Sequence, residues 1–322
     1  MIDLTNENTT YKDISQHLKD NFTKGFDIFD SAQVSLQLAS MVNYKPILFP
    51  LIESVVKQGV AEIGGYKGNH LKELNVLSKR KGFTLHSVDP ANKILPEDHL
   101  SYFSEVEFFD QKSSDYFCTK KSQECDIFII DGDHNFETVS LELENVLTRD
   151  NVQLVVLHDT SWPCGYIDTF YDKESMVKRK VANAGYMNLQ KDSSDLSLPF
   201  NFDIDFDEVA ESKNDGLESN SGVTTAIEKS LSKYSDWGTI KISSIYGLTI
   251  LYRDSLRSNT DFISKIEHIE YVKPFLDILE LNRIMLLSQM YKQGLTWNDD
   301  QCEIERLKRI IEQKNQIKNS EK

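Results

Sequence analysis

Two short segments carry an unusual concentration of side chains that can bind a metal or move a proton. Asp131-Gly132-Asp133-His134 ends the apolar run at 125–131, and His158-Asp159 directly follows the apolar run at 152–157. Carboxylate oxygens and imidazole nitrogens bind divalent cations, and an imidazole can also act as a base near neutral pH. If the two runs are neighbouring parallel strands, these side chains meet at one edge of a sheet. The segments therefore predict a metal site with a base beside it.

Each of these side chains also has a structural explanation. Asp131 and Asp159 end predicted strands, where an aspartate often caps the following helix. We assign that capping role to Asp133, because a helix is expected to begin near residue 136. His134 is the candidate base, against the alternative of an ordinary surface or core histidine. His158 stays open between a metal ligand, a base and a buried hydrogen-bonding residue.

A glycine-rich turn at residues 59–69 is the second candidate site. An apolar run precedes it, and apolar residues at helical spacing follow it, so the turn joins a buried strand to a helix. Gly64, Gly65 and Gly68 leave room where the backbone bends towards a flat ligand, and the helix directs free N–H groups at the turn. Asp89 ends the next predicted strand, where doubly wound folds hold a ribose. The turn therefore predicts a nucleotide-like cofactor with Asp89 as its ribose acceptor.

Two common phosphate-binding patterns are absent from this turn. The dinucleotide pattern Gly-x-Gly-x-x-Gly would need a glycine at Ile63, and the P-loop would need Gly-Lys-Ser/Thr where Gly68-Asn69-His70 stands. A nicotinamide-dependent enzyme is therefore the least favoured interpretation. The pattern that is present is Glu62-x-Gly64-x-x-x-Gly68.

Strand-like and helix-like segments must alternate to position these residues. The predicted strands are 60–63, 85–89, 106–110, 125–131, 152–157 and two segments within 237–253. This alternation predicts a Rossmann-like, doubly wound, mostly parallel seven-stranded α/β sheet with an antiparallel edge hairpin. We expect an N-terminal helical cap at 1–55, a cofactor-binding domain at 56–253 and C-terminal helices at 254–322.

The alternation lapses between residues 161 and 235. The first part, 162–171, is aromatic and predicts a lid over the site. The second part, 192–221, contains nine acidic residues and one lysine. Because a structureless stretch of this length is uncommon unless it is functional or mobile, we expect a lid followed by a mobile acidic segment.

Composition narrows the classes of partner. The chain has 322 residues and a net charge of −15, which argues against a nucleic-acid partner because phosphate binding needs basic surface. The sequence shows no signal peptide and no apolar run long enough for a membrane span, so we expect a cytoplasmic protein without a membrane partner. The four cysteines lack metal-ligand spacing and are expected to be reduced. The apolar helices predicted at 261–293 could pair two subunits as a homodimer.

Three motifs carry a resemblance to a known family. The pattern Glu62-x-Gly64-x-x-x-Gly68 resembles the first motif of class I S-adenosylmethionine-dependent methyltransferases. Residues 126–134 with 155–159 resemble the metal-dependent O-methyltransferase branch (family 24-like), which includes sugar methyltransferases of macrolide pathways and a cephalosporin-biosynthesis protein. The run at 158–165 (His-Asp-Thr-Ser-Trp-Pro-Cys-Gly) with 221–228 is similar to a bacterial subfamily with the same long insert. The likeness covers roughly residues 55–253.

The resemblance implies a role for each matching residue. The cofactor contacts that it implies are Glu62, Gly64, Gly68 and Asp89, with Asp110 or its neighbours near the adenine; the metal ligands are Asp131 and Asp159, and the general base is His134. From their positions we add Gly65 and Asp131 as cofactor contacts and His158 as a metal ligand, and Asp110 stays open as an ordinary turn residue. One position departs from the pattern, because relatives place two adjacent acids where this chain has His158-Asp159. An imidazole there weakens the case for Mg²⁺ and leaves room for Mn²⁺ or iron, or for no metal.

The sequence thus predicts an O-methyltransferase that uses S-adenosylmethionine and Mg²⁺ or Mn²⁺ to methylate a hydroxyl of a small molecule or sugar. One alternative is metal-free methylation with His134 or His158 as the base. The other is a non-catalytic, cofactor-binding interaction protein.

Overall fold

A computed structural model describes residues 41–91, 94, 102–161, 164–170, 184–186 and 220–286. The chain divides into two compact units, Met1–Lys273 and Pro274–Lys322. Most of the predicted N-terminal cap, most of the predicted lid and acidic segment, and the end of the chain lie outside the described residues.

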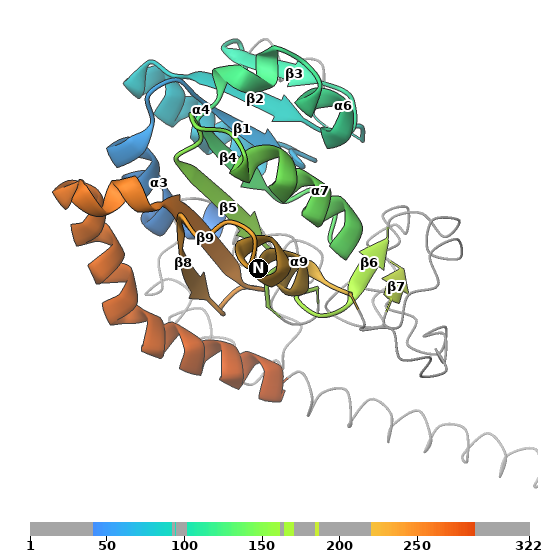
Figure 1. Cartoon of the computed structure of the whole chain (residues 1–322), viewed down its shortest axis with the longest axis vertical. Helices are drawn as coiled ribbons and strands as arrows, with labels where there is room; N and C mark the ends of the chain where they lie inside the picture. Colours follow the sequence, from blue (N-terminus) through green and yellow to red (C-terminus); the bar gives the residue numbers. More distant parts are fainter. Residues whose placement is uncertain are drawn as a thin grey trace, which may run out of the picture. The chain divides into compact units, whose positions relative to one another are not determined.

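A seven-stranded sheet forms the centre of the first unit (Figure 1). Its strands are β1 (Gly59–Ile63), β2 (Thr84–Val88), β3 (Val106–Phe109), β4 (Ile127–Ile130), β5 (Leu154–His158), β8 (Trp237–Ile242) and β9 (Leu248–Arg253). Their order is β3-β2-β1-β4-β5-β9-β8, with β1 to β5 parallel and β9 antiparallel to both β5 and β8. The predicted mostly parallel sheet with an antiparallel edge hairpin is confirmed. The order reverses between β1 and β4, which is where doubly wound folds bind ligands.

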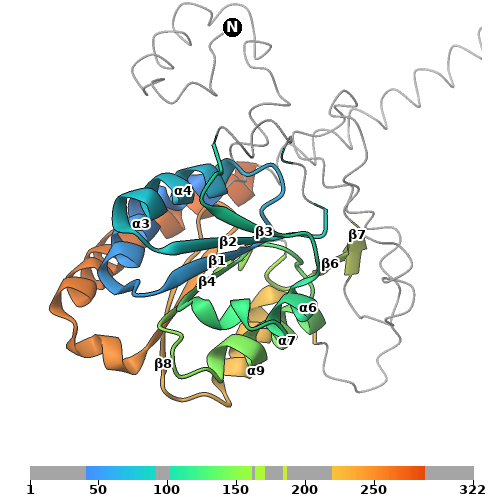
Figure 2. The same ribbon diagram turned by 90° about the horizontal axis from the view of Figure 1, so that it is seen from above.

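Helices cover both faces of this sheet, as Figure 2 shows from above. One face carries α3 (Lys45–Val55) and α4 (Asn69–Lys81), and the other carries α6 (Ser113–Phe117), α7 (Phe136–Leu147) and α9 (Val223–Leu231). Short 3-10 turns span η2 (Met41–Tyr44), η3 (Lys121–Glu124) and η5 (Asp254–Ser258). The sheet is therefore an inner layer whose carboxyl edge is left for a site.

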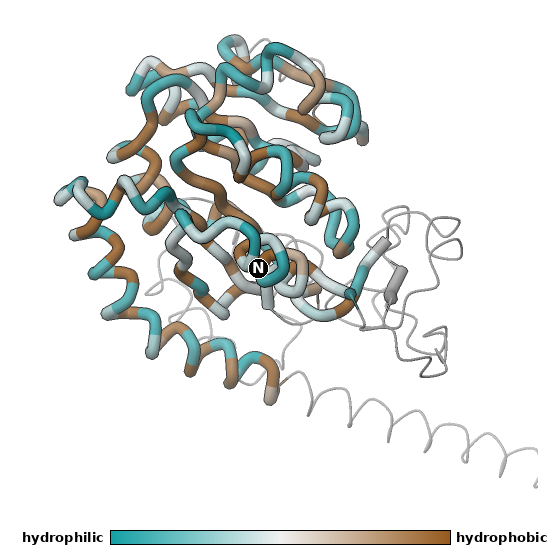
Figure 3. Tube along the Cα trace, in the orientation of Figure 1, coloured by the Kyte–Doolittle hydropathy of each residue, from teal (hydrophilic) through white to brown (hydrophobic). Residues whose placement is uncertain are grey.

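The central strands are apolar on both faces because both faces are covered. Every residue of β1, β4 and β5 is buried. Figure 3 shows the hydrophobic residues concentrated along the central strands, with the helices alternating between polar and apolar faces. Val139 and Leu143 of α7 pack into this core, at spacing that places them on one side of the helix. The core thus fixes the positions at which β4 and β5 end.

The segment 161–235, predicted as a lid followed by a mobile acidic stretch, contains a small second sheet. Its parallel strands are β6 (Asp168–Phe170) and β7 (Ala184–Tyr186), which sequence periodicity did not indicate. No helix in the described part of the chain is long and apolar enough to cross a membrane.

Helical backbone runs through residues 260–273 at the end of the first unit and through 274–286 in the second. In the second unit Phe275, Ile278 and Leu281 are more than half exposed. The homodimer stays a prediction.

Candidate active site

Four side chains from two adjacent strand ends meet at the carboxyl edge of the sheet. Ile130 of β4 and Leu157 of β5 are register partners, so the residues that follow them lie side by side. The imidazole of His134 lies 2.9 Å from Asp159 (Nε2 to Oδ2) and 3.7 Å from Asp131 (Nε2 to Oδ1). His158 Nδ1 lies 3.0 Å from Asp131 Oδ1 and 3.4 Å from Asp159 Oδ2. We call Asp131, His134, His158 and Asp159 the strand-end cluster.

The loop that carries His134 is fixed by the start of α7. Asn135 is the N-cap of this helix, because its side-chain oxygen accepts a hydrogen bond from the Thr138 N–H at 2.9 Å. The prediction that Asp133 caps the helix was therefore wrong. Asp133 instead accepts hydrogen bonds from the His134 N–H and the Thr138 hydroxyl, at 2.9 and 3.1 Å. The hydrogen bonds accepted by Asp133 and Asn135 thus fix the backbone that carries His134 at the start of α7.

A strained turn between β8 and β9 holds His158. The imidazole Nε2 lies 3.1 Å from the Ile245 carbonyl oxygen, and the Tyr44 ring packs against the imidazole in a T-shaped arrangement with 5.8 Å between centroids. Ile245 and Tyr246 have φ values of 51° and 65°, and Asp159 has a φ of 55°. Non-glycine residues rarely adopt these left-handed conformations, and they concentrate at functional sites. Sequence reasoning missed the Ile245 carbonyl, because a backbone acceptor leaves no signal in side-chain identity.

The cluster is electrostatically balanced by its own histidines. Burial by itself would lower the pKa of His134, but the carboxylates of Asp159 and Asp131 raise that pKa to about 10. The same balance of burial against the two carboxylates raises the pKa of His158 well above its usual value. Burial by itself would raise the pKa values of Asp131 and Asp159, but the two imidazoles hold these pKa values below the usual aspartate range. At neutral pH the cluster thus pairs two imidazolium groups with two carboxylates.

Three members of the cluster have the donor set of a metal site. One ligand atom each from Asp131, His134 and Asp159 lies within 4.8 Å of the others. The two ring nitrogens of His158 face Asp131 and the Ile245 carbonyl instead. Two carboxylates and an imidazole suit Mn²⁺, Fe²⁺ or Zn²⁺ better than Mg²⁺. The geometry therefore places the His134 imidazole beside a cation position between the two aspartates, and the assignments of His134 as the base and of His158 as a metal ligand stay predictions.

The glycine turn lies directly against this cluster. Gly64 donates its N–H to the Val88 carbonyl at 2.9 Å and has a φ of +94°. A β-carbon at Gly64 would lie 2.3 Å from the Asp131 carbonyl oxygen, so only glycine permits this approach. At Gly65 a β-carbon would lie 2.6 Å from the Ser87 hydroxyl, and Gly68 begins α4 in a left-handed conformation. Gly64 and Gly65 thus bring the ends of β1, β2 and β4 together, and Gly68 lets the start of α4 pack against Ile94 and Phe103.

The predicted ribose and adenine residues lie at the next strand ends. Asp89 accepts hydrogen bonds from the backbone N–H groups of Tyr66 and Ala91, both at 2.7 Å, and so ties the glycine turn to β2. A carboxylate has about four lone-pair sites, so these two bonds leave acceptor capacity for a ligand. Asp110 directly follows Phe109, the register partner of Val88, so it ends β3 beside the end of β2.

Glu62 supplies an unused acceptor beneath the glycine turn. Its Oε1 lies 2.6 Å from His70 Nδ1 on α4, whereas Oε2 is buried and has no hydrogen-bond partner among the described residues. A buried acceptor without a donor is costly unless something fills the role. The cationic amino group of an amino-acid-like ligand is a donor of the right charge, so the residues present fit the predicted cofactor.

The two segments that carry the narrower family likeness contact each other. The Thr224 hydroxyl donates to the Thr160 carbonyl at 2.6 Å, and the Val223 N–H donates to the Cys164 carbonyl at 3.0 Å. Asp168 Oδ1 accepts from the N–H groups of Phe136 and Gly222, both at 2.7 Å. This packing joins the start of α9 to the loop after β5 and to the start of α7.

Comparison with known proteins gives likeness of fold only. No protein-family model and no curated protein matches the chain. Among solved structures, the chain is similar to the S-adenosylhomocysteine-bound methyltransferase PaMTH1 of Podospora anserina, with 10% identity, 76% of this chain and 97% of that chain covered, and a TM-score of 0.33. It is similar to apo CalS11, a TDP-rhamnose 3'-O-methyltransferase of calicheamicin biosynthesis, with 16% identity, coverages of 56% and 90%, and a TM-score of 0.31.

A third similar structure is apo CmcI-N160, with 17% identity, coverages of 38% and 53%, and a TM-score of 0.29. The chain thus spans about half the length of that protein. At these identities and scores the comparisons carry no argument about activity, which must come from the site.

Proposed function

We propose that the chain is a class I S-adenosylmethionine-dependent methyltransferase that methylates a hydroxyl of a small molecule or sugar with the help of a divalent cation. The observation that carries the proposal is the contact between the glycine turn and the strand-end cluster. A β-carbon at Gly64 would lie 2.3 Å from the Asp131 carbonyl oxygen, so a cofactor at the turn is next to two carboxylates and two imidazoles.

Binding and orientation are the tasks of the turn. Glu62 Oε2 is the free acceptor for the amino group of the cofactor, and Asp89 retains acceptor capacity for its ribose. Asp110 ends the strand beside Asp89 and is the proposed adenine neighbour. The cofactor supplies a methyl group on a sulfonium that is already a good leaving group, so the protein must align the acceptor oxygen and help to remove its proton.

His134 is the proposed acceptor of that proton. In the cluster by itself the pKa of His134 is about 10, because Asp159 and Asp131 outweigh the effect of burial, so the imidazole already holds a proton at pH 7. It can act as a base only if another positive charge offsets the two aspartates. This requirement is the argument for a cation held by Asp131 and Asp159, which would also stabilise the developing alkoxide.

Calorimetric titration of metal-stripped protein is the first test. S-adenosylhomocysteine is expected to bind with micromolar affinity and NAD is not, and each titration is repeated with Mn²⁺ and Mg²⁺. Binding of NAD alone, or of neither ligand, would overturn the proposal. Binding of S-adenosylhomocysteine without methyl transfer to any hydroxylated acceptor would favour the non-catalytic alternative.

A substitution separates the roles of turn and cluster. Asp159→Ala is expected to lower Mn²⁺-dependent methyl transfer to a panel of sugars and phenols by at least about 100-fold, because a charged ligand is lost. The affinity for S-adenosylhomocysteine should stay within about threefold, since the turn is intact. Asp150→Ala, an exposed aspartate beyond α7, is the matched control. Equal loss of both properties would remove the metal role of Asp159, and activity insensitive to chelators would favour metal-free methylation.

A further inference from the structure

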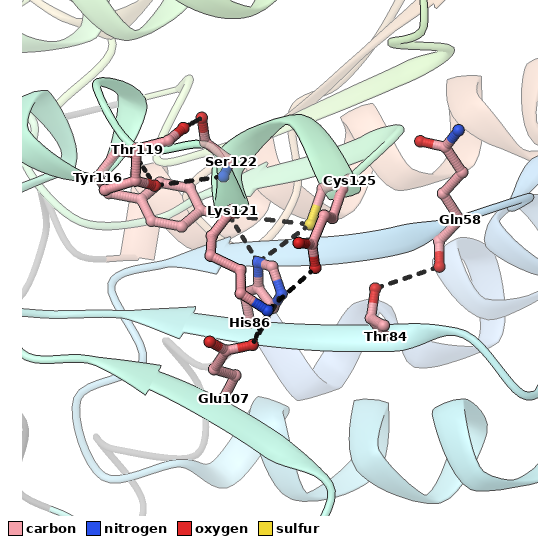
Figure 4. Close-up of polar contacts among 10 residues, drawn as sticks. Gln58, Thr84, His86, Glu107, Tyr116, Thr119, Lys121, Ser122 and Cys125 are labelled. Carbon is pink, nitrogen blue, oxygen red and sulfur yellow. Dashed lines mark hydrogen bonds and ion pairs between the residues drawn. The ribbon is translucent and has the colours of Figure 1, made fainter.

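A second group of acids surrounds an imidazole away from the strand ends. His86 of β2 and Glu107 of β3 are register partners on adjacent parallel strands, and Lys121 and Glu124 come from η3. Figure 4 shows the His86 ring between Glu107 on one side and Tyr116 and Cys125 on the other. We call His86, Glu107, Lys121 and Glu124 the β2–β3 cluster.

The imidazole is held by one nitrogen and directs the other at the acids. His86 Nδ1 lies 2.8 Å from the Tyr116 hydroxyl and 3.4 Å from Cys125 Sγ. His86 is 1% exposed, and its Nε2 is buried without a hydrogen-bond partner in the described part of the chain. The nearest acid is Glu107, whose Oε2 is 3.6 Å away. The buried nitrogen is thus aimed at a group of acids but bonded to none.

A cation already lies between the two glutamates. The Lys121 ammonium is 3.1 Å from Glu107 Oε2 and 3.3 Å from Glu124 Oε2, as an internal counter-ion would be. All three side chains are 45% exposed, so ions and water can reach the position. One ligand atom each from His86, Glu107 and Glu124 lies within 4.8 Å of the others. The Lys121 ammonium thus lies where a divalent cation bound by Glu107 and Glu124 would lie.

We propose that His86 Nε2, Glu107 and Glu124 form a divalent-cation site, and that the metal displaces the Lys121 ammonium. An imidazole with two carboxylates suits Zn²⁺ or Mn²⁺ rather than Ca²⁺, and open positions would be filled by water. Tyr116 has the role of the outer partner that ligating histidines usually have, accepting the Nδ1–H and fixing the ring. The site is separate from the proposed transferase centre and does not depend on it.

The competing explanation is an exposed ion-pair network that binds no metal. Such pairs are common and contribute little to stability. The two explanations differ on the buried Nε2, which an ion-pair network leaves unused, and on the effect of removing the lysine.

Zn²⁺ affinity of the full-length chain tests the ligands. Competition with a chromophoric chelator is measured in protein carrying Asp159→Asn, which removes a charged ligand from the strand-end cluster and so weakens it as a second Zn²⁺ site; circular dichroism checks that this background is folded. We expect one equivalent of Zn²⁺, and at least tenfold weaker binding when Glu107→Gln is added. Glu105→Gln, an exposed glutamate two residues away, is the control and should change nothing. Equal affinities for the two glutamine variants would overturn the proposal.

Removal of the lysine tests the displacement. Lys121→Met is expected to tighten Zn²⁺ binding about tenfold, because the metal no longer competes with an ammonium for Glu107 and Glu124. Lys120→Met, an exposed neighbour, should leave the affinity unchanged. Both lysines and Glu107 are at least partly exposed, so these variants should fold. Unchanged or weaker binding in Lys121→Met would show that the lysine does not occupy a metal position.

Discussion

The strand-end cluster and the β2–β3 cluster each combine two carboxylates with imidazole, yet they balance their charge in different ways. In the strand-end cluster the side chains of Asp131 and Asp159 are 21% and 12% exposed, and the positive charge comes from two histidines with raised pKa values. In the β2–β3 cluster the glutamates are 45% exposed, His86 is kept neutral by burial, and a lysine supplies the charge.

This difference shows how solvent access selects the counter-cation. A carboxylate removed from water needs a positive charge in direct contact, so it holds a proton on a neighbouring imidazole. A carboxylate at the surface can use a flexible ammonium, whose attraction is weakened by water and salt. A metal must therefore replace protons in the first cluster and an ammonium in the second.

Removing one carboxylate from each cluster should give the largest difference in stability between the two clusters. Asp159→Asn is expected to lower the free energy of unfolding at pH 7 by about 3 kcal/mol, because it leaves buried positive charge without its partner. Glu107→Gln should cost less than about 1 kcal/mol, as for exposed ion pairs. Urea unfolding of both variants in metal-free buffer measures the difference. Similar costs would mean that the two clusters do not differ in the way described.

The pH dependence of stability should follow His134. Its folded pKa of about 10 lies above the unfolded value of about 6.5, so its contribution is complete below pH 6.5 and is lost as pH rises towards 10. In the variant His134→Gln, the loss of unfolding free energy between pH 6.5 and pH 10 should be smaller by on the order of 2 kcal/mol. His268→Gln, at an exposed position, is the control. Unfolding curves at pH 6, 8 and 10 provide the measurement, and parallel profiles for all three proteins would contradict the pairing.

Glu142 tests the rule with a buried carboxylate that forms no salt bridge with any described residue. Burial on α7 raises the pKa of Glu142 to about 8, although a hydrogen bond from Ser113 opposes the shift. Since this pKa is above the unfolded value of about 4.5, the folded protein loses stability as pH rises from 4.5 to 8. Glu142→Gln should therefore be more stable than the unmodified protein at pH 8 by on the order of 1 kcal/mol.

The gain from Glu142→Gln should vanish at pH 4.5. Thermal unfolding at both pH values measures it, with the exposed Glu144→Gln as the matched variant. An equal effect of the two substitutions would show that burial does not hold the proton on Glu142.

Salt should produce the smallest effect, and only at the surface. Lys121→Met is expected to lower stability slightly in low salt and not measurably in 0.5 M NaCl, because exposed ion pairs are screened (roughly 4 Å Debye length at that concentration). The cost of Asp159→Asn should change little over the same range. A salt-sensitive Asp159 would mean that water reaches the strand-end cluster freely.

The sheet could be predicted because its signals are local. Apolar runs at 60–63 and 152–157 mark strands that are covered on both faces, and the turn at Gly64 marks the switch to a helix. The side chains that end β4 and β5 followed from the same pattern. The contacts of these side chains did not, because the partner of His158 is the Ile245 carbonyl and the N-cap of α7 is Asn135. The β2–β3 cluster gave no signal, since its members are spread over residues 86–124: strand register pairs His86 with Glu107, and the other two members come from η3.

The hydrogen bonds to Asp168 affect which changes in chain length this protein can tolerate. One carboxylate oxygen accepts hydrogen bonds from the N–H groups of Phe136 and Gly222, so the starts of α7 and α9 are tied to β6 at a single anchored point. The length of chain between residues 187 and 219 can then change without moving the start of α7 or α9, because closing a longer loop costs only a little more entropy. A change in the length of this segment is therefore expected to leave the methyl-transfer apparatus proposed for the strand ends in place.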